Sequence, residues 1–139
     1  MTVESIMTRK VVTVESDDSL KIIQEIFENV GFHHLLVVEN GKLVGVISDH
    51  DLFKALSPFI GRTLERRQDI ALLNKKAHQI MSIKPVTVDK EFRIKYAARL
   101  MLEKNVSCLP VTSPEGNIEG IVTWKDIFKA YLRESEDEC

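Results

Sequence analysis

The residues best suited to chemistry are a hydroxyl and a carboxylate that occur twice with the same spacing. Ser48 precedes Asp51 in GVISDHD, and Thr123 precedes Asp126 in GIVTWKD. On a helix start, this spacing lets the hydroxyl cap the helix and the carboxylate complete a capping box. The same pair can receive the vicinal diol of a ribose, because an ionised carboxylate accepts two hydrogen bonds. The N–H groups of such a first turn also favour phosphate. Capping alone, and capping combined with binding, are both open interpretations at this point.

Both pairs belong to a longer unit that occurs twice. The stretch IMTRKVVTV at 6–14 returns 74 positions later as IMSIKPVTV, with six of nine residues identical. The stretch GKLVGVISDHDLFKA at 41–55 returns 75 positions later as GNIEGIVTWKDIFKA. Chance would give about one match in the first window. With only two copies, we expect a closed pair related by pseudo-twofold symmetry rather than an open solenoid.

Each copy predicts the order strand, helix, strand, strand, helix. In copy one the strand pair is joined through Asn40-Gly41, a strong signal for a tight hairpin. The copy-two loop is one residue longer, which explains the change in offset from 74 to 75. The predicted strands are Val11–Val14, Leu35–Val38 and Leu43–Ile47 in copy one, and Val86–Val88, Leu109–Val111 and Ile118–Val122 in copy two.

Apolar residues at helical spacing predict a first helix in each copy. Asp18 or Ser19 is expected to cap its start in copy one, and Gly31 to mark its end. In copy two Asn105 stands in the place of Gly31. A second helix is expected to begin near Asp51 in copy one and at the matching aspartate in copy two.

The segment between the copies has no counterpart in either of them. After Pro58 and Gly61, we predict a helix from Thr63 to Ala77. It is either a covering or connecting helix, or an insert that binds a partner or forms a dimer. We therefore divide the chain into repeat 1 (1–57), a helical connecting segment (58–78), repeat 2 (79–133) and an acidic tail (134–139).

Composition excludes several classes of function. The formal net charge of −2 over 139 residues argues against nucleic acid or an anionic membrane as a partner. No apolar run approaches the roughly 20 residues that span a bilayer, and the N-terminal residues lack signal-peptide architecture. A cytoplasmic location is expected, and the two cysteines, Cys108 in an apolar stretch and Cys139 at the end, suit a reducing compartment.

Enzyme activity and metal binding are not expected. The sequence has no glycine-rich phosphate loop, no catalytic triad and no paired catalytic carboxylates. Its four histidines lack zinc-type spacing. Cys108 is expected to be a small buried hydrophobic residue, because no base is arranged to activate it.

Taken together, these motifs resemble a known family. Two copies of an I-M-T/S start, a hairpin with an L-P-V-like strand and G-h-h-S/T-x-x-D-h (h apolar) resemble a tandem pair of cystathionine-β-synthase (CBS) domains, the Bateman module. The resemblance covers about residues 3–56 and 78–132. One departure is Leu36, which stands where copy two has the more family-like Pro110.

The resemblance implies an α+β fold of two β-α-β-β-α repeats and a regulatory module without a required cofactor. Its ligands would be adenosine compounds (AMP, ADP, ATP or S-adenosylmethionine), held in two clefts that are each completed by both repeats. One cleft would use Thr8, Val11, Val12, Phe32, His33, His34, Thr123 and Asp126. The other would use Ser48, Asp51, Ser82, Pro85, Val86, Val106, Ser107 and Cys108. Lys125 and Arg9 are the candidates for contact with phosphate, although a solvated lysine is an equal interpretation of Lys125.

Output would pass through a protein effector or through self-association. The family commonly forms homodimers through the second helix of each repeat, so we expect an interface there. The apolar residues assigned to it are Leu52, Phe53, Leu56, Ile127, Phe128 and Tyr131. A ligand-free module for protein interaction or dimerisation is the alternative function. The single tryptophan, Trp124, would be either an ordinary helix-start residue or a contact with the ligand or a second subunit.

Overall fold

The computed structural model describes residues 1–30, 33–56 and 73–137 of the chain. Two compact units form, and neither coincides with one repeat. The central unit is Val12–Lys84, and the terminal unit joins Met1–Val11 to Pro85–Cys139. The repeat boundaries predicted from the sequence therefore describe the order of motifs along the chain and do not describe the compact units. In space, the leading segment of copy one belongs with the body of copy two, and residues 79–84 belong with the body of copy one.

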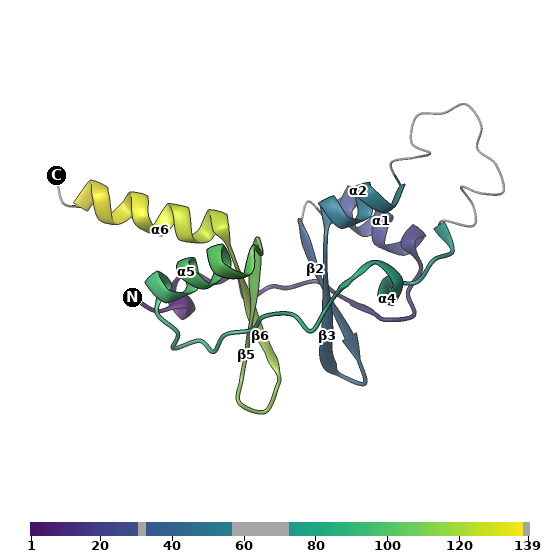
Figure 1. The fold of residues 1–139 in the computed structure, drawn as a ribbon, viewed down its shortest axis with the longest axis horizontal. Coiled ribbons are helices and arrows are strands. Elements are labelled where there is room, and N and C mark those ends of the chain that lie inside the picture. Colours follow the sequence, from purple (N-terminus) through teal and green to yellow (C-terminus); the bar gives the residue numbers. More distant parts are fainter. Residues whose placement is uncertain (31–32, 57–72, 138–139) are drawn as a thin grey trace. The chain divides into compact units, whose positions relative to one another are not determined.

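The central unit is a four-stranded sheet with helices (Figure 1). Its elements are β1 (Thr13–Glu15), α1 (Leu20–Val30), β2 (His34–Glu39), β3 (Lys42–Ser48), α2 (Asp49–Leu56), α4 (Ala77–Ile80) and β4 (Ser82–Ile83). The strand order is β1-β2-β3-β4, with β1 parallel to β2 and the other two pairs antiparallel. The buried side chains of its core are Val14, Leu20, Ile23, Leu35, Val37, Ile47, Leu52, Leu56 and Ala77.

The terminal unit repeats this plan with shorter pairing at its edges. Its elements are the 3-10 turn η1 (Val3–Ser5), α5 (Ile94–Lys104), β5 (Cys108–Thr112), β6 (Ile118–Thr123) and α6 (Trp124–Asp137). β5 and β6 are antiparallel. Val88 pairs in parallel with Val111, as β1 does with β2, and Thr8 pairs with Ile121, as β4 does with β3. The core contains Val3, Met7, Val88, Ile94, Ala97, Met101, Leu109, Val111, Val122, Ile127 and Ala130.

Local signals in the sequence explain several element boundaries. Asn40 and Gly41 have φ of 53° and 79°, so the β2–β3 loop is the tight hairpin that their identities predict. Ser19 rather than Asp18 caps α1, because its Oγ accepts the Ile22 N–H at 3.4 Å. Asn105 ends α5 in the left-handed conformation, with φ 54° and ψ 48°.

Four expectations need correction or fall outside the described residues. The strand predicted at 11–14 is confined to β1, and that at 86–88 is reduced to one bridge. The helix predicted to reach Ala77 does not run through Lys76, whose backbone is extended with φ −97° and ψ 156°. Most of that predicted helix, like the helix end assigned to Gly31, lies outside the described residues.

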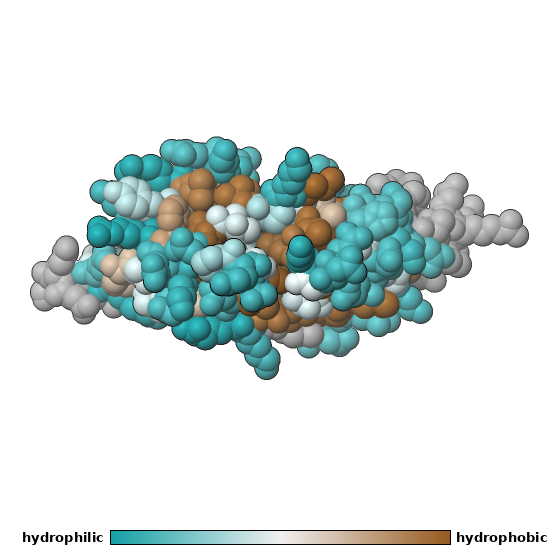
Figure 2. All heavy atoms as spheres, turned by 90° about the horizontal axis from the view of Figure 1, so that it is seen from below, coloured by the Kyte–Doolittle hydropathy of each residue, from teal (hydrophilic) through white to brown (hydrophobic). Residues whose placement is uncertain are grey.

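The second helices bury part of the surface that we expected to be free. Leu52, Leu56 and Ile127 are 7–8% exposed and lie in the cores of their own units. Their assignment to a dimer interface is therefore wrong. Phe53 and Phe128 are exposed, as is Tyr131. Apolar side chains also reach the surface among hydrophilic ones on the face drawn in Figure 2.

Candidate functional site

The first cap, Ser48 with Asp51, closes the N-terminus of α2. Helix α2 begins at Asp49, directly after Ser48 ends β3. The Ser48 N–H donates to Asp51 Oδ2 at 2.9 Å, and the Asp51 N–H donates to Ser48 Oγ at 3.0 Å. These reciprocal bonds form a capping box in which aspartate takes the place of the usual glutamate. The capping interpretation is therefore confirmed for copy one.

The second cap, Thr123 with Asp126, closes α6 in the same way. The Thr123 N–H donates to Asp126 Oδ2 at 2.9 Å, and the Asp126 N–H donates to Thr123 Oγ1 at 3.4 Å. The Thr123 hydroxyl also lies 3.1 Å from Asp126 Oδ2, to which it donates. Among the residues that the structure describes, the bonds of both caps involve Oδ2 of the aspartate, which leaves Oδ1 as an acceptor. Capping therefore does not use up the capacity of either carboxylate to bind a ligand.

A short segment from the start of a repeat lies beside each cap. Thr8 and Ile121 exchange two backbone hydrogen bonds of 2.9 Å, which fixes Thr8 two positions from Thr123 in register. In the central unit Ser82 pairs with Val46, two positions before Ser48. The structure thus brings Thr8 near the second cap and Ser82 near the first. Each of these residues was assigned to the cleft of that same cap.

Glycines make these close pairings possible. A Cβ added at Gly120 would lie 2.8 Å from the Thr8 carbonyl oxygen and 2.9 Å from Met7 Sδ. A Cβ at Gly45 would meet Met81 Sδ and lie 2.9 Å from the Ser82 carbonyl oxygen. The glycine that opens each repeated motif therefore has a packing role, because any side chain would push the leading segment away from its strand.

The residue before each hairpin contacts the neighbouring helix start. The Asp49 N–H donates to the His33 carbonyl at 2.9 Å, and His33 Nδ1 lies 2.8 Å from Asp49 Oδ2. In copy two the Trp124 N–H donates to the Ser107 carbonyl at 3.2 Å. Each contact lies within one unit. The predicted assignment of His33 to the cleft of Thr123, and of Ser107 to that of Ser48, joins residues of different units and stays a prediction.

His34 follows His33 and lies opposite Ser48 in the β2–β3 pairing. Burial lowers the pKa of His34 below its ordinary value of 6.5. Asp49 and Asp51 oppose this shift in pKa, while His33 adds to it. The neutral imidazole is therefore the form that the central unit favours at this position.

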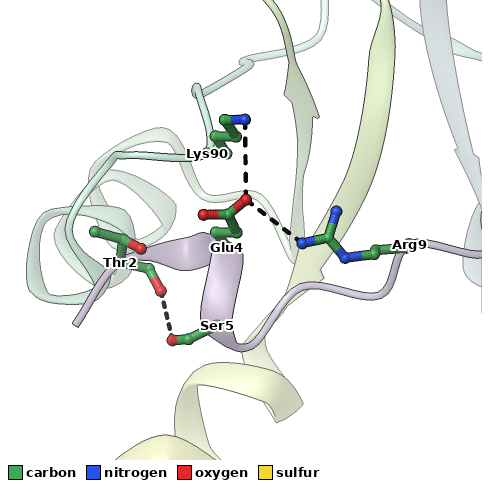
Figure 3. A network of polar contacts seen from close by, with 5 residues as sticks. All are labelled: Thr2, Glu4, Ser5, Arg9 and Lys90. Atoms are coloured by element: carbon green, nitrogen blue, oxygen red, sulfur yellow. Dashed lines mark hydrogen bonds and ion pairs between the residues drawn. The ribbon is translucent and has the colours of Figure 1, made fainter.

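The two predicted phosphate contacts lie in the terminal unit and have other partners there. Arg9 lies 3.5 Å from Glu4, which is also 3.9 Å from Lys90 (Figure 3). All three side chains are well exposed, so these ion pairs are weak and can exchange. Lys125 Nζ lies 5.8 Å from the centre of the Trp124 ring, within the range of a cation–π contact.

The remaining predicted residues mostly contribute apolar surface. Val12, Val86 and Val106 are half-buried and pack against the core of their own unit. Cys108 is buried, as expected. Val11 and Pro85 are half-buried, and Phe32 lies outside the described residues.

Sequence reasoning missed Asp49 and Glu4. Asp49 became relevant only once α2 was seen to begin there, two residues before the expected start. The acidic first turn of α2 was the available signal. Glu4 precedes the first repeated motif, so comparison of the copies did not reveal it.

The described ranges hold neither a membrane-spanning helix nor a metal-binding cluster. Over residues 1–30, 33–56 and 73–137, no helix has the length and apolar character needed to cross a membrane. The same part of the chain holds no group of three or more His, Cys, Asp or Glu side chains arranged to bind a metal ion.

Two β-α-β-β-α repeats with matching capped helices define the class of the protein. The family model for the CBS domain matches residues 3–58 and again 77–133. The chain belongs to the CBS domain family and carries two copies of the domain. The α+β fold class and the resemblance seen in the sequence are thereby confirmed.

Relatives of known sequence support this membership. A CBS domain-containing protein of Dictyostelium discoideum is 33% identical over 133 residues, covering 94% of this chain and 91% of that protein. An uncharacterized protein of Methanocaldococcus jannaschii is 29% identical over 134 residues. The match covers 96% of this chain but 45% of the archaeal protein, so the chain spans about half the length of that relative.

Similar solved structures include complexes with adenosine compounds. The CBS domain pair of protein MJ0100, in complex with 5′-methylthioadenosine and S-adenosylmethionine, has a TM-score of 0.79 and 26% identity, over 96% of this chain and 98% of that one. CBSX2 in complex with AMP has a TM-score of 0.77 and 28% identity, over 96% and 98% of the two chains.

Proposed function

We propose that this chain is a regulatory module that binds adenosine-containing ligands at its two caps. The observation that carries the proposal is the duplicated cap, in which each aspartate uses Oδ2 for the helix and keeps Oδ1 as an acceptor. The complexes of MJ0100 and CBSX2 add support, because chains of similar fold hold ligands that contain adenosine.

Each cap would hold the ribose. Because Oδ2 holds each carboxylate at the helix start, Oδ1 is positioned to accept a hydrogen bond from a ribose hydroxyl, and a charge-assisted bond of this kind is strong. Apolar residues assigned to each cleft, such as Val11 and Val86, would enclose the base together with backbone groups. The remaining predicted residues would complete the clefts from the other repeat.

Regulation would act by population shift. A ligand that contacts both repeats favours the arrangement in which its two sets of contacts are made together, and this changes the surface offered to a partner. The output would then pass to an effector protein or to a second copy of the chain. No chemical step is required of the module, so we propose that it is not itself an enzyme.

Isothermal titration calorimetry with AMP, ADP, ATP and S-adenosylmethionine tests this function. Asp51→Asn and Asp126→Asn each remove a charged acceptor worth about 1.5–3 kcal/mol, so each variant should lose about 10- to 150-fold in affinity at its own cap. Glu103→Gln, an exposed change on α5, is the matched control. Unchanged affinity in both cap variants would contradict the proposal.

A ligand-free assembly module is the second candidate, and exposed aromatic residues favour it. Phe53 is 60% exposed on α2, and Phe128 is 61% exposed on α6. We propose that these side chains, with Tyr131, contribute to a homodimer interface. Sedimentation with and without AMP separates the two functions. The assembly function predicts self-association that AMP does not alter, and a melting temperature that no adenosine compound raises.

A further inference from the structure

The two caps are built alike, but the residues around them differ in charge. Three pairs of repeat-related positions make the second cap the more positive one, with the residue of the first cap named first: Asp49 and Trp124, His50 and Lys125, Ile83 and Arg9. A fourth pair, His78 and Glu4, changes the charge in the opposite direction. Each of these three differences between the repeats makes the surroundings of the second cap more positive or those of the first cap more negative. Lys84 and its counterpart Lys10 are alike and do not contribute to the difference.

The first cap concentrates negative charge on one helical turn. Asp49 occupies the first position of α2 and Asp51 the third, so the two residues are separated by about 3 Å of helix rise. His33 is the partner of Asp49, at 2.8 Å. The imidazole offsets the charge of that carboxylate only when it carries a proton. Ile83, the neighbour of Ser82 on β4, is 69% exposed and adds an apolar rather than a basic surface.

The second cap has cations at two of these positions, Lys125 and Arg9, where the first has His50 and Ile83. Lys125 lies in the first turn of α6, over the Trp124 ring. Arg9 follows Thr8, which the Ile121 pairing fixes to β6. Arg9 is bound to Glu4 across 3.5 Å. That exposed pair is weak, so a phosphate can compete with Glu4 for the guanidinium.

We infer that the two caps select adenosine ligands by charge. The second cap takes those that carry phosphate, and the first takes those whose 5′ substituent is neutral or cationic, such as a thioether or a sulfonium. This inference rests on the proposed function. It adds that Asp49 is a specificity-determining residue, because its carboxylate repels phosphate without contributing to the capping box.

Coulomb energies give the size of the effect. A unit charge about 6 Å from a phosphate, at the high dielectric of an exposed site, changes affinity about three- to tenfold in dilute salt. Added salt reduces this effect at both caps, but with opposite signs. It should strengthen AMP binding at the first cap by screening repulsion, and weaken AMP binding at the second by screening attraction.

The experiment compares AMP with 5′-methylthioadenosine, which shares the nucleoside but lacks the phosphate. Calorimetry at about pH 8, where imidazoles are largely neutral, is run on Asp126→Asn to report the first cap and on Asp51→Asn to report the second. The first cap should bind 5′-methylthioadenosine better than AMP, and the second should show the reverse order.

Added substitutions then test the residues named. Asp49→Asn in the Asp126→Asn background should raise AMP affinity about three- to tenfold and leave 5′-methylthioadenosine binding unchanged. Lys125→Gln in the Asp51→Asn background should lower AMP affinity alone. Glu103→Gln is the control in both backgrounds. If Asp49→Asn is unstable, titration of Asp126→Asn with AMP at two salt concentrations tests the same repulsion between Asp49 and phosphate.

The outcomes separate the inference from the proposed function. The same ratio of AMP to 5′-methylthioadenosine affinity at both caps would overturn the inference, as would Asp49→Asn without effect on AMP or salt effects of equal sign. In each of these cases adenosine compounds still bind, and the proposed function stands. Failure of every adenosine compound to bind the unmodified chain would overturn both.

Discussion

The central and terminal units share a backbone plan, and they differ in the side chains beside the caps. Each unit places a capped helix directly after a strand, and a leading segment on a glycine of that strand. Next to these capped helices, the first cap has the His33–Asp49 pair and the second has Trp124 with Lys125. The comparison teaches that duplication preserved the positioning of a hydroxyl and a carboxylate, while the neighbouring residues that would set ligand charge diverged.

The largest expected effect tests whether the two cores are equivalent. Leu52 and Ile127 are paired by the repeat, and each is 7% exposed. Leu52→Ala and Ile127→Ala should each lower the free energy of unfolding by about 2–5 kcal/mol, because each leaves a cavity. Urea denaturation measures both. A loss at one position only would show that the units do not share a packing plan.

The adjacent aromatic residues are the matched controls. Phe53→Ala and Phe128→Ala change exposed side chains, so the free energy of unfolding should move by no more than about 0.5 kcal/mol. If these residues form the proposed dimer interface, both variants should weaken self-association in sedimentation. Unchanged self-association would remove them from the interface.

The next effect compares the two close approaches at Gly45 and Gly120. Gly45→Ala and Gly120→Ala should each destabilise the fold by about 1–3 kcal/mol, because the added Cβ meets a methionine side chain and a carbonyl oxygen. Thermal unfolding followed by circular dichroism measures the loss. Full stability in either variant would mean that its leading segment does not lie against the strand.

A smaller effect is expected at the caps themselves. Ser48→Ala and Thr123→Ala each remove a hydroxyl that accepts an N–H from the first turn. Each should cost about 1 kcal/mol of unfolding free energy, measured by urea denaturation. The cost should be larger for Ser48, whose accepted bond is 3.0 Å against 3.4 Å for Thr123. Equal or reversed costs would show that the length of the accepted hydrogen bond does not determine the stabilisation at these caps.

The smallest effect distinguishes His34 from its counterpart, Cys108. Because burial lowers the folded-state pKa of His34 below 6.5, the unfolded chain binds a proton more readily. The stability that His34 contributes is present above about pH 6.5 and is lost as the pH falls through the lower folded-state pKa. Unfolding free energy should therefore fall less between about pH 7 and pH 5 in His34→Gln than in the unmodified chain. Cys108→Ala should keep the unmodified pH dependence, because a thiol carries no charge in that range. The same pH dependence of unfolding free energy in the unmodified chain, His34→Gln and Cys108→Ala would contradict the lowered pKa of His34.

Much of the fold could be predicted because its signals are local. The Asn40-Gly41 turn, the Asn105 helix end and the spacing of each cap depend on a few adjacent residues, and all three are confirmed. The duplicated motifs added the order of the elements. Periodicity alone did not separate Leu52 from Phe53, because tertiary packing decides which apolar side of a short helix is buried, and Leu52 is the one that packs into the core.

The pairing of distant segments could not be read from local patterns. Thr8 and Ile121 are far apart in sequence, and neither position carries a signal for the other. The same holds for Glu4 with Lys90, where two exposed charges meet through tertiary structure. The assignments that join site residues of different units, such as His33 with Thr123, stay predictions.

The most direct test of ligand binding at a cap is a fluorescence titration of Trp124 with AMP. Trp124 is the single tryptophan, is 52% exposed and directly follows Thr123. We predict a saturable change in its emission that Asp126→Asn shifts to concentrations at least about tenfold higher. A signal that does not saturate, or that saturates at the same concentration in the variant, would contradict adenosine binding at the second cap.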